Sequence, residues 1–320
     1  MVKKQKSGKR VNNNSKDSSE PPKPFPWNRL PQELQVMILA YLPRPDLNKC
    51  RTLNRETFSI IRANERQMRR KQISLIEFKG RRNPTKVTLR YDCPEEGKVS
   101  NWTKLLDDVM NEEEPDIPTT LLDRFADKIK DGHINQLVIS RLKLTDNTLS
   151  LLSSCLRKSQ CQVFDLSLLD LSVGDVTPSA LIRFICDLAP TNVEINFIKD
   201  CSSEHFGPEL CSFLISRHFF TVSGLYDGYS EAVPLSMDDD LLGRLTADDF
   251  FICAPNLITH EGLKSFTMRS VKNGFSKPLR GIIEVTYPIN HGISWLKSLP
   301  NVEVTIKNDS VVEIAMSYKP

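Results

Sequence analysis

The chain has 320 residues, of which 39% are apolar and 26% charged, an ordinary composition for a globular protein of roughly two domains. Its eight cysteines include no CxxC pair, which favours a reduced, intracellular protein over a disulfide-rich secreted one. No apolar run approaches the roughly 20 residues that span a bilayer, and no apolar segment follows the basic N-terminus. We therefore expect a protein of the cytoplasm, the nucleus or both, with no membrane partner.

Charge divides the chain into unlike parts behind a net charge of +3. Residues 1–90 hold 22 Lys or Arg against 7 Asp or Glu, which leaves 21 against 33 for the remainder. Residues 1–24 have almost no large apolar side chain, so we expect a disordered basic tail. The run KKQKSGKR within it fits a nuclear import signal, although a solvated tail is the commoner use of such a run.

Three short helices are expected within residues 27–63. Pro31 suits the start of the first helix because its missing N–H would have no helical partner there, and Pro43 ends it. Asp46 and Asn54 suit the caps of a second and a third helix. Three helix starts within about 40 residues predict a small helical unit.

The first helix carries apolar side chains on more than one face. Its main stripe, at helical spacing, consists of Leu34, Met37, Ile38, Tyr41 and Leu42, and its other side of Val36, Leu39 and Ala40. A unit of roughly 40 residues rarely has a sufficient core by itself. The surplus apolar surface therefore predicts docking, either on another protein or on the rest of this chain.

The text of this unit, LPQELQVMILAYLPRPDL followed by CRTLNRETF, resembles the F-box, the adaptor-binding module of Skp-cullin-F-box ubiquitin ligases. The positions that match its LPxEL, IL..L and DL elements are Leu30, Pro31, Glu33, Leu34, Ile38, Leu39, Leu42, Asp46 and Leu47. Phe58 stands where tryptophan is commonest, which keeps the aromatic volume but removes the indole N–H donor. We place the F-box at residues 25–70.

This resemblance implies a non-catalytic subunit without a cofactor. It would bind a Skp-type adaptor and, through it, cullin, and would recruit an unidentified protein substrate for ubiquitination. The implied adaptor-binding residues are Leu30, Pro31, Glu33, Leu34, Ile38, Leu39, Leu42 and Leu47. A short N-terminal F-box followed by a divergent C-terminal domain is similar to the plan of the nematode-type F-box family.

Residues 71–94 are interpreted as a basic linker, part of a solvated helix that leaves the F-box. The stretch from Arg62 to Arg90 holds ten basic and two acidic residues. A nucleic-acid patch is less favoured, because such surfaces usually place aromatic side chains among the charges, and only Phe78 and Tyr91 lie near.

Residues 95–320 predict alternating strands and helices. Strand-like runs start at 137, 163, 193 and 221, and helix-like segments start at 145, 178 and 208. This spacing is close to that of leucine-rich repeats, so we predict an irregular leucine-rich-repeat-like β/α solenoid that presents a face to the substrate. The whole chain is then a multidomain α and α/β protein.

Less regular parts of this region are also interpreted. Helices are expected near 102–110 and 120–130, with a loop over 111–118 between them. The period is lost between 226 and 262, where residues 226–240 are expected to form an inserted loop. Further strands are expected from 264, 282 and 302, the last after a helix and turn in 291–301.

Catalytic and metal sites are not predicted. The motifs GxSxG, HExxH, GxxxxGK and GxGxxG do not occur. The nearest metal-like set, Cys201, His205, Cys211 and His218, lacks the tight pairs of structural zinc sites. We interpret Asp238, Asp239 and Asp240 as an acidic surface loop, and His133, His260 and His291 as loop residues.

A second hypothesis remains open beside the ubiquitin-ligase subunit. In this alternative the helical N-terminus packs on its own C-terminal domain in a repeat-domain interaction protein of the nucleus that associates with nucleic acid. Salt-sensitive binding through Arg69, Arg70, Arg81 and Arg82 would then be expected.

Overall fold

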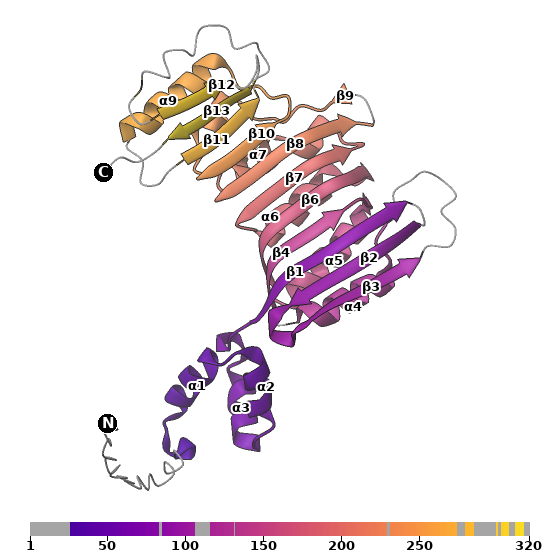
Figure 1. Ribbon diagram of the computed structural model, residues 1–320, viewed down its shortest axis with the longest axis vertical. Coiled ribbons are helices and arrows are strands. Elements are labelled where there is room, and N and C mark those ends of the chain that lie inside the picture. The colour runs from indigo at the N-terminus through magenta and orange to yellow at the C-terminus, as the bar shows by residue number, and fades with distance from the viewer. Residues whose placement is uncertain are drawn as a thin grey trace, which may run out of the picture. The chain divides into compact units, whose positions relative to one another are not determined.

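The computed structural model describes residues 26–82, 85–105, 116–130, 132–228, 231–273, 279–284, 299, 302–306 and 311–316. Its chain forms two compact units (Figure 1). The first comprises Met1–Leu42 and Asp46–Arg69, and the second comprises Pro43–Pro45 and Arg70–Pro320. The predicted tail over residues 1–24 lies outside the described residues.

The first unit consists of three short α-helices, as its spacing predicts. They are α1 (Gln32–Tyr41), α2 (Arg44–Arg51) and α3 (Arg55–Ala63), with short 3-10 turns η1 (Trp27–Arg29) and η2 (Glu65–Gln67) at either end. Asn54 caps α3, since its side chain accepts a hydrogen bond from Thr57 N at 2.7 Å. The cap predicted at Asp46 is wrong: α2 starts two residues earlier, and the Asp46 carboxylate pairs with Lys49 Nζ at 2.8 Å instead.

The core of the first unit is small. Its buried apolar side chains are Val36, Leu39, Leu47, Ile60, Ile61 and Met68, with Trp27, Leu42 and Cys50 packed against them. Val36 and Leu39 lie on the side of α1 opposite to its predicted main stripe. The stripe itself, with Leu34, Met37, Ile38 and Tyr41, faces solvent. A helix can bury only one face on so few neighbours, and α1 buries its shorter apolar side.

The second unit is built on one mixed sheet, whose main strand order is β12-β13-β11-β10-β8-β7-β6-β4-β1-β2-β3. Seven strands in the middle run parallel: β1 (Lys71–Arg82), β4 (Gly132–Ser140), β6 (Gln162–Asp175), β7 (Asn192–Lys199), β8 (Phe219–Asp227), β10 (Asp249–Cys253) and β11 (Leu279–Glu284). Antiparallel strands close both edges: β2 (Thr85–Cys93) and β3 (Lys98–Leu105) at one, β13 (Val311–Met316) and β12 (Val302–Ile306) at the other. Two short strands, β5 (Lys143–Thr145) and β9 (Glu231–Ala232), pair with β6 and β8.

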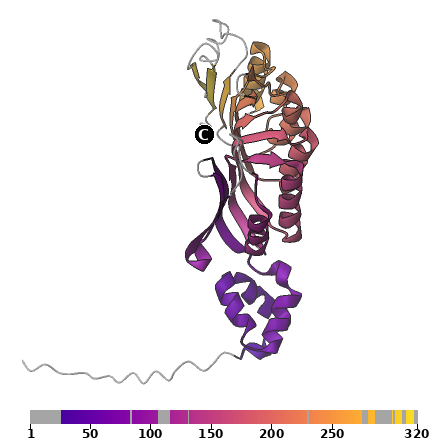
Figure 2. The ribbon, with the colours of Figure 1, turned by 90° about the vertical axis from the view of Figure 1, so that its right-hand side faces the viewer.

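The α-helices of this unit lie on one face of the sheet (Figure 2). They are α4 (Thr119–Ile129), α5 (Asp146–Lys158), α6 (Pro178–Leu188), α7 (Pro208–Leu214), α8 (Asp239–Gly243) and α9 (His260–Asn273). Phe78 of β1 packs on Phe125 of α4 with ring centroids 5.3 Å apart, so Phe78 and, two residues before it, the buried Ile76 face the helices. Since side chains alternate along a strand, Glu77 and Lys79 lie on the other face, here called the open face.

Neighbouring parallel strands follow one another in the chain at a steady spacing. From β4 to β11 they start at Gly132, Gln162, Asn192, Phe219, Asp249 and Leu279, so each start lies 27 or 30 residues after the last. The predicted loss of period between 226 and 262 is therefore wrong, because β10 continues the spacing there. The inserted loop predicted at 226–240 is wrong in part, because it contains the short β9 and the start of α8. The sequence DFFIC of β10 has only five residues, too few for a clear alternation.

Other local predictions have mixed outcomes. Helices near 120–130, 145, 178 and 208 are confirmed as α4 to α7, as are strands from 282 and 302. The strand predicted at 264 is wrong, since those residues form α9, and Trp102 lies in β3 and not in a helix. Most of the expected loop 111–118 and the helix and turn expected in 291–301 lie outside the described residues.

The predicted basic linker over 71–94 is also wrong in structure, because the segment forms β1 and β2 inside the sheet. In β2 the buried residues Val87, Leu89, Tyr91 and Cys93 alternate with polar ones. This is the two-residue period of a strand with one buried face. The charged side chains that suggested a solvated linker occupy the open face and the strand ends.

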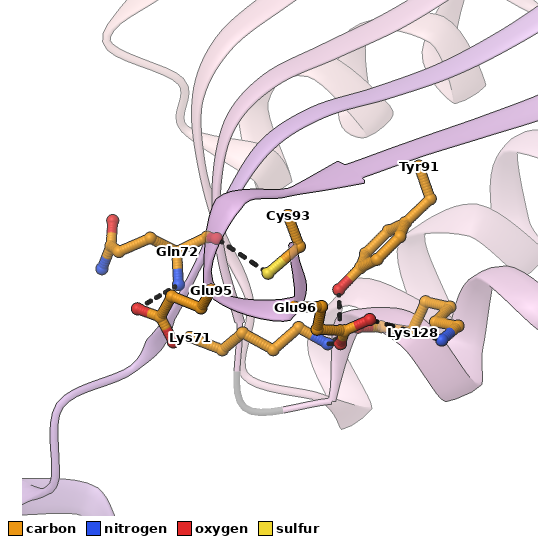
Figure 3. A network of polar contacts seen from close by, with 7 residues as sticks. All are labelled: Lys71, Gln72, Tyr91, Cys93, Glu95, Glu96 and Lys128. Atoms are coloured by element: carbon orange, nitrogen blue, oxygen red, sulfur yellow. Dashed lines mark hydrogen bonds and ion pairs between the residues drawn. The ribbon is translucent and has the colours of Figure 1, made fainter. Parts of the chain in front are cut away.

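A polar cluster joins the start of β1 to β2 and α4 (Figure 3). The Glu96 carboxylate accepts a hydrogen bond from Tyr91 Oη at 3.0 Å and pairs with Lys71 Nζ at 2.7 Å and Lys128 Nζ at 3.6 Å. Burial opposes ionisation of Glu96, but the hydrogen bonds from Lys71 and Tyr91 and both ammonium charges leave its pKa below the ordinary value. Lys71 is thus held inside the domain as a structural residue.

Candidate functional site

Helix α1 presents its main apolar stripe to solvent. Tyr41 is 81% exposed and Met37 56%, and Leu34 and Ile38 are exposed beside them. The helix holds one charged side chain, that of Glu33 in its first turn. An exposed row of large apolar side chains on one helix is unusual in a protein that acts alone, and it is typical of a surface that another protein covers.

The eight predicted adaptor-binding residues divide into two sets in the structure. Pro31, Glu33, Leu34 and Ile38 are exposed, and Leu30 and Leu42 are half-buried. Leu39 and Leu47 are buried in the core of the helical unit. Direct contact with an adaptor stays a prediction for all eight residues. The side chains of the four exposed residues are accessible to such a partner.

The first turn of α1 is held by a buried glutamine. Gln35 Nε2 donates to the carbonyl oxygen of Leu30 at 2.9 Å and to that of Trp27 at 3.4 Å. These bonds tie η1 to α1, while Leu34 N and Gln35 N both donate to Pro31 O at 3.1 Å. The segment from Trp27 to Gln35 therefore holds Pro31 and Leu34 in a defined position on the surface.

Four exposed apolar residues of this unit were absent from the predicted site: Met37, Tyr41, Leu53 and Phe58. Met37 and Tyr41 share the stripe with Leu34 and Ile38, so helical spacing was sufficient to include them. Leu53 follows α2 and is 71% exposed. No periodicity marks a residue between two helices, so its exposure comes only from the structure.

The open face of the large sheet carries linked polar side chains. Ser167 Oγ donates to Glu194 Oε2 at 2.9 Å, and Asn196 Nδ2 donates to Glu194 Oε1 at 2.8 Å. Ser223 Oγ extends the row by donating to Asn196 Oδ1 at 2.7 Å. These bonds cross β6, β7 and β8 and hold the side chains in fixed orientations, which lowers the entropy cost of recognising another polar surface.

The set considered for zinc is not brought together. His205 Nδ1 accepts from Ser202 N at 3.0 Å and its Nε2 lies 2.8 Å from Val176 O, so both ring nitrogens are engaged. His218 Nε2 pairs with Asp248 at 3.1 Å. Among the described residues, no group of three or more His, Cys, Asp or Glu could hold a metal ion.

The acidic run 238–240 has a structural role. Asp238 caps α8 by accepting from Leu241 N at 2.8 Å. Asp239 accepts from Thr259 N at 2.8 Å and from Thr259 Oγ1 at 2.6 Å. The carboxylates therefore hold α8 and the start of α9. Of the histidines expected in loops, His133 lies in β4, His260 begins α9, and His291 lies outside the described residues.

Buried thiols give no sign of a nucleophile. Burial raises the pKa of Cys161 to about 12, of Cys201 to about 11 and of Cys211 to about 12. These groups stay protonated at neutral pH, whereas a nucleophilic cysteine needs a lowered pKa.

The basic residues considered for nucleic acid include one that is engaged within the protein. Arg70 Nη1 donates to the carbonyl oxygen of Gln160 within the large unit, Arg81 is exposed at the end of β1, and the side chain of Arg82 is not described.

None of the described helices is both long and apolar enough to cross a membrane.

Comparison with known families identifies the helical unit. The family model described as F-box domain matches residues 27–66, and no curated protein matches the chain. F-box domains bind Skp-type adaptors in Skp-cullin-F-box complexes, and F-box proteins are generally non-catalytic. The match covers η1, the three helices and part of η2. Residues 27–66 of this chain are therefore an F-box domain, followed by a mixed α/β domain with one large sheet.

Proposed function

We propose that this chain is the substrate-recognition subunit of a Skp-cullin-F-box ubiquitin ligase. Its F-box would dock on a Skp-type adaptor, and its α/β domain would recruit the protein to be ubiquitinated. The observation that carries the proposal is the exposed stripe of α1 within a segment that matches the F-box model.

The stripe can supply the binding energy. Fully burying a leucine, isoleucine or methionine side chain contributes roughly 1.5–3 kcal/mol. Leu34, Met37 and Ile38 are each about half exposed, so an adaptor that covers them gains a substantial part of that energy at each position. A few such apolar anchors commonly supply most of the affinity of a protein interface.

The α/β domain suits the recruiting role by its architecture. We interpret it as an irregular leucine-rich-repeat-like array, supported by the steady strand spacing and the neighbouring order of successive parallel strands. Helices on one face leave the other face for a partner. The fixed polar side chains of that open face favour a polar or charged substrate segment.

Co-expression with a Skp-type adaptor tests the docking. The wild-type chain should copurify with the adaptor, and the double substitution Leu34→Ala with Ile38→Ala should weaken the complex at least tenfold. The matched control is Leu257→Ala, which makes the same change at an exposed leucine of the α/β domain. Copurification that survives the double substitution would contradict docking through this stripe, and a wild-type chain that never captures the adaptor would contradict the function.

Substrate recruitment needs a separate measurement. Proximity labelling with the full chain should mark a set of proteins that the Leu34→Ala, Ile38→Ala variant still marks, because the α/β domain is unchanged. Ubiquitination of those proteins should fall in the variant. Equal ubiquitination by both chains would show that the labelled proteins are not substrates of this complex.

A further inference from the structure

A pocket of about 460 Å³ lies on the open face of the sheet. Its walls come from β1, β4, β6, β7 and β8 and include Lys79, Arg141 and Lys199. Two carboxylates, of Glu77 and Asp170, lie in the same pocket. Three cationic side chains therefore meet two anionic ones in a hollow that crosses five elements of the domain.

A row of left-handed residues on neighbouring strands lies at this pocket. At one level of four neighbouring segments the backbone is left-handed: φ is 56° at Arg141, 52° at Asp170, 57° at Phe197 and 63° at Gly224. The residues just before them pair normally, and the left-handed residues of β6, β7 and β8 are skipped in the register. As a result Ser140 and Arg141, although adjacent, line one pocket, which the regular alternation of a strand would not allow.

A left-handed conformation is uncommon for any residue except glycine and is unfavourable for a bulky one. Phe197 nevertheless adopts it, with its ring 57% exposed. A Cβ at Gly224 would lie 3.0 Å from Phe197 Cδ1, so a side chain at that position would crowd the ring. The apolar Phe197 thus forms part of the wall of a charged pocket.

Hydrogen-bond donors in the pocket have spare capacity. Ser140 is only 7% exposed, and among the described residues its Oγ has no hydrogen-bond partner. Lys79 Nζ lies 3.7 Å from Glu77 Oε1, and Arg141 Nε lies 3.8 Å from Asp170 Oδ2, both longer than a hydrogen bond. A buried hydroxyl without a partner costs roughly 1–3 kcal/mol, which a bound acceptor would recover.

Asp170 is held mainly by Lys199. Its Oδ1 accepts from Lys199 Nζ at 2.6 Å, a strong charge-assisted bond, whereas its Oδ2 lies 3.8 Å from Arg141 Nε. Lys79 and Arg141 therefore each have one weakly paired carboxylate in the pocket, Glu77 for Lys79 and Asp170 for Arg141. The arrangement favours an incoming acceptor that carries negative charge.

We propose that this pocket binds an oxyanion carried by a peptide, with Lys79, Arg141 and Ser140 as its donors and Phe197 against an apolar neighbour of the anion. The peptide would belong to a recruited substrate, and in that respect the proposal rests on the proposed function. A phosphate and a carboxylate share the required chemistry.

Binding of small probes to the full chain tests the pocket. The probes are N-acetyl-phosphoserine amide, N-acetyl-glutamic acid amide and, as the neutral reference, N-acetyl-serine amide, titrated by calorimetry at constant ionic strength. At least one anionic probe should bind wild-type protein tenfold more tightly than the neutral one. Tighter binding of the phosphoserine probe would assign the phosphate as ligand, and tighter binding of the glutamate probe the carboxylate.

Substitutions locate the site. Arg141→Gln and Lys79→Gln should each weaken the anionic probe about tenfold, and Ser140→Ala several-fold. Lys158→Gln, on an exposed position of α5, is the matched control and should change nothing. A thermal melt of each variant without probe checks that it folds. Affinity that is unchanged in Arg141→Gln and Lys79→Gln, or a wild-type chain that prefers neither anion, would overturn the proposal.

Adaptor binding by the same variants separates this proposal from the proposed function. The pocket variants should still copurify with a Skp-type adaptor, because the F-box is unchanged. A wild-type chain that binds the anion but never the adaptor would contradict the ligase function and support the pocket, and the reverse result would do the opposite.

Discussion

The two units of this protein use their apolar residues in opposite ways. In the F-box unit six large apolar side chains are buried, and six others, Leu34, Met37, Ile38, Tyr41, Leu53 and Phe58, are exposed. The much larger α/β unit also exposes six among its described residues, but scattered over strands, helices and loops: Val99, Leu151, Phe164, Phe197, Leu257 and Met268. Four of the six exposed apolar side chains of the F-box unit lie on α1, and such a concentration is typical of a surface that a partner covers.

The open face of the α/β unit differs from the apolar stripe of α1 because polar side chains cover it. The open face of the α/β unit holds its side chains by hydrogen bonds such as those of Glu194 and Asn196, and the pocket at Ser140 leaves donors available. Docking through apolar contacts gives affinity, whereas recognition through oriented donors gives selectivity. If the proposed function holds, the small unit would supply affinity for a common adaptor and the large unit would choose among substrates.

The largest effect is expected where the small unit is weakest, in its core. Leu47 is fully buried, so Leu47→Ala should lower the free energy of unfolding by about 2–5 kcal/mol, a large part of what a unit with six buried apolar residues has. Hydrogen exchange should show α1 to α3 losing protection while β4 to β8 keep theirs. Leu53→Ala, the same change at an exposed leucine, is the control and should leave protection unchanged. Full protection in Leu47→Ala would show that this core does not hold the unit.

A substitution in the sheet of the α/β unit should remove a smaller share of the free energy of unfolding, because the core of that unit is larger. A Cβ at Gly80 would lie 1.9 Å from the carbonyl oxygen of Arg141, so Gly80→Ala must move backbone and should cost about 1–3 kcal/mol in a denaturant titration. Gly243→Ala is the control, because its Cβ meets nothing nearer than 3.5 Å. Equal costs for the two substitutions would show that the sheet yields easily at Gly80.

A pH-dependent effect is expected from the cluster at Glu96. Its folded pKa lies below the ordinary value of 4.5, so its charge stabilises the fold above that pH, and the contribution disappears as pH falls through the lowered folded pKa. Glu96→Gln should lower the free energy of unfolding by about 1 kcal/mol at pH 7, with the difference from wild type shrinking in acid. Glu204→Gln, an exposed position, is the control. A difference that is constant from neutral to acid pH would exclude the charge as its cause.

The smallest effect on stability is expected on the stripe itself. Tyr41 is the most exposed large apolar residue of the F-box unit, so Tyr41→Ser should change the free energy of unfolding by less than about 0.5 kcal/mol. A larger loss would mean that the stripe supports the fold of the free chain, and the contrast between the units would weaken.

Particular segments show how far sequence patterns reach. The three helices of the F-box were predictable because prolines end α1 and Asn54 caps α3, both local effects. The strands β1 and β2 were missed because ten basic residues between Arg62 and Arg90 suggested a solvated linker, although Val87, Leu89 and Tyr91 alternate correctly for a strand. The segment KSFTMRS of α9 was predicted as a strand because its apolar residues Phe266 and Met268 alternate with polar ones. In so short a segment this pattern fits a strand and a helix equally well.

Local pattern alone determined three short helices in residues 27–63, because caps, prolines and spacing act within a few residues, and the resemblance of the same residues to F-box motifs identified the unit. Which face of α1 is buried was decided only by tertiary structure, since both faces are apolar and the choice depends on the neighbours that Leu47 and Ile61 provide. The pocket at Ser140 likewise joins residues from Glu77 to Tyr226 through the register of five strands, and no local signal carries the register of a parallel sheet.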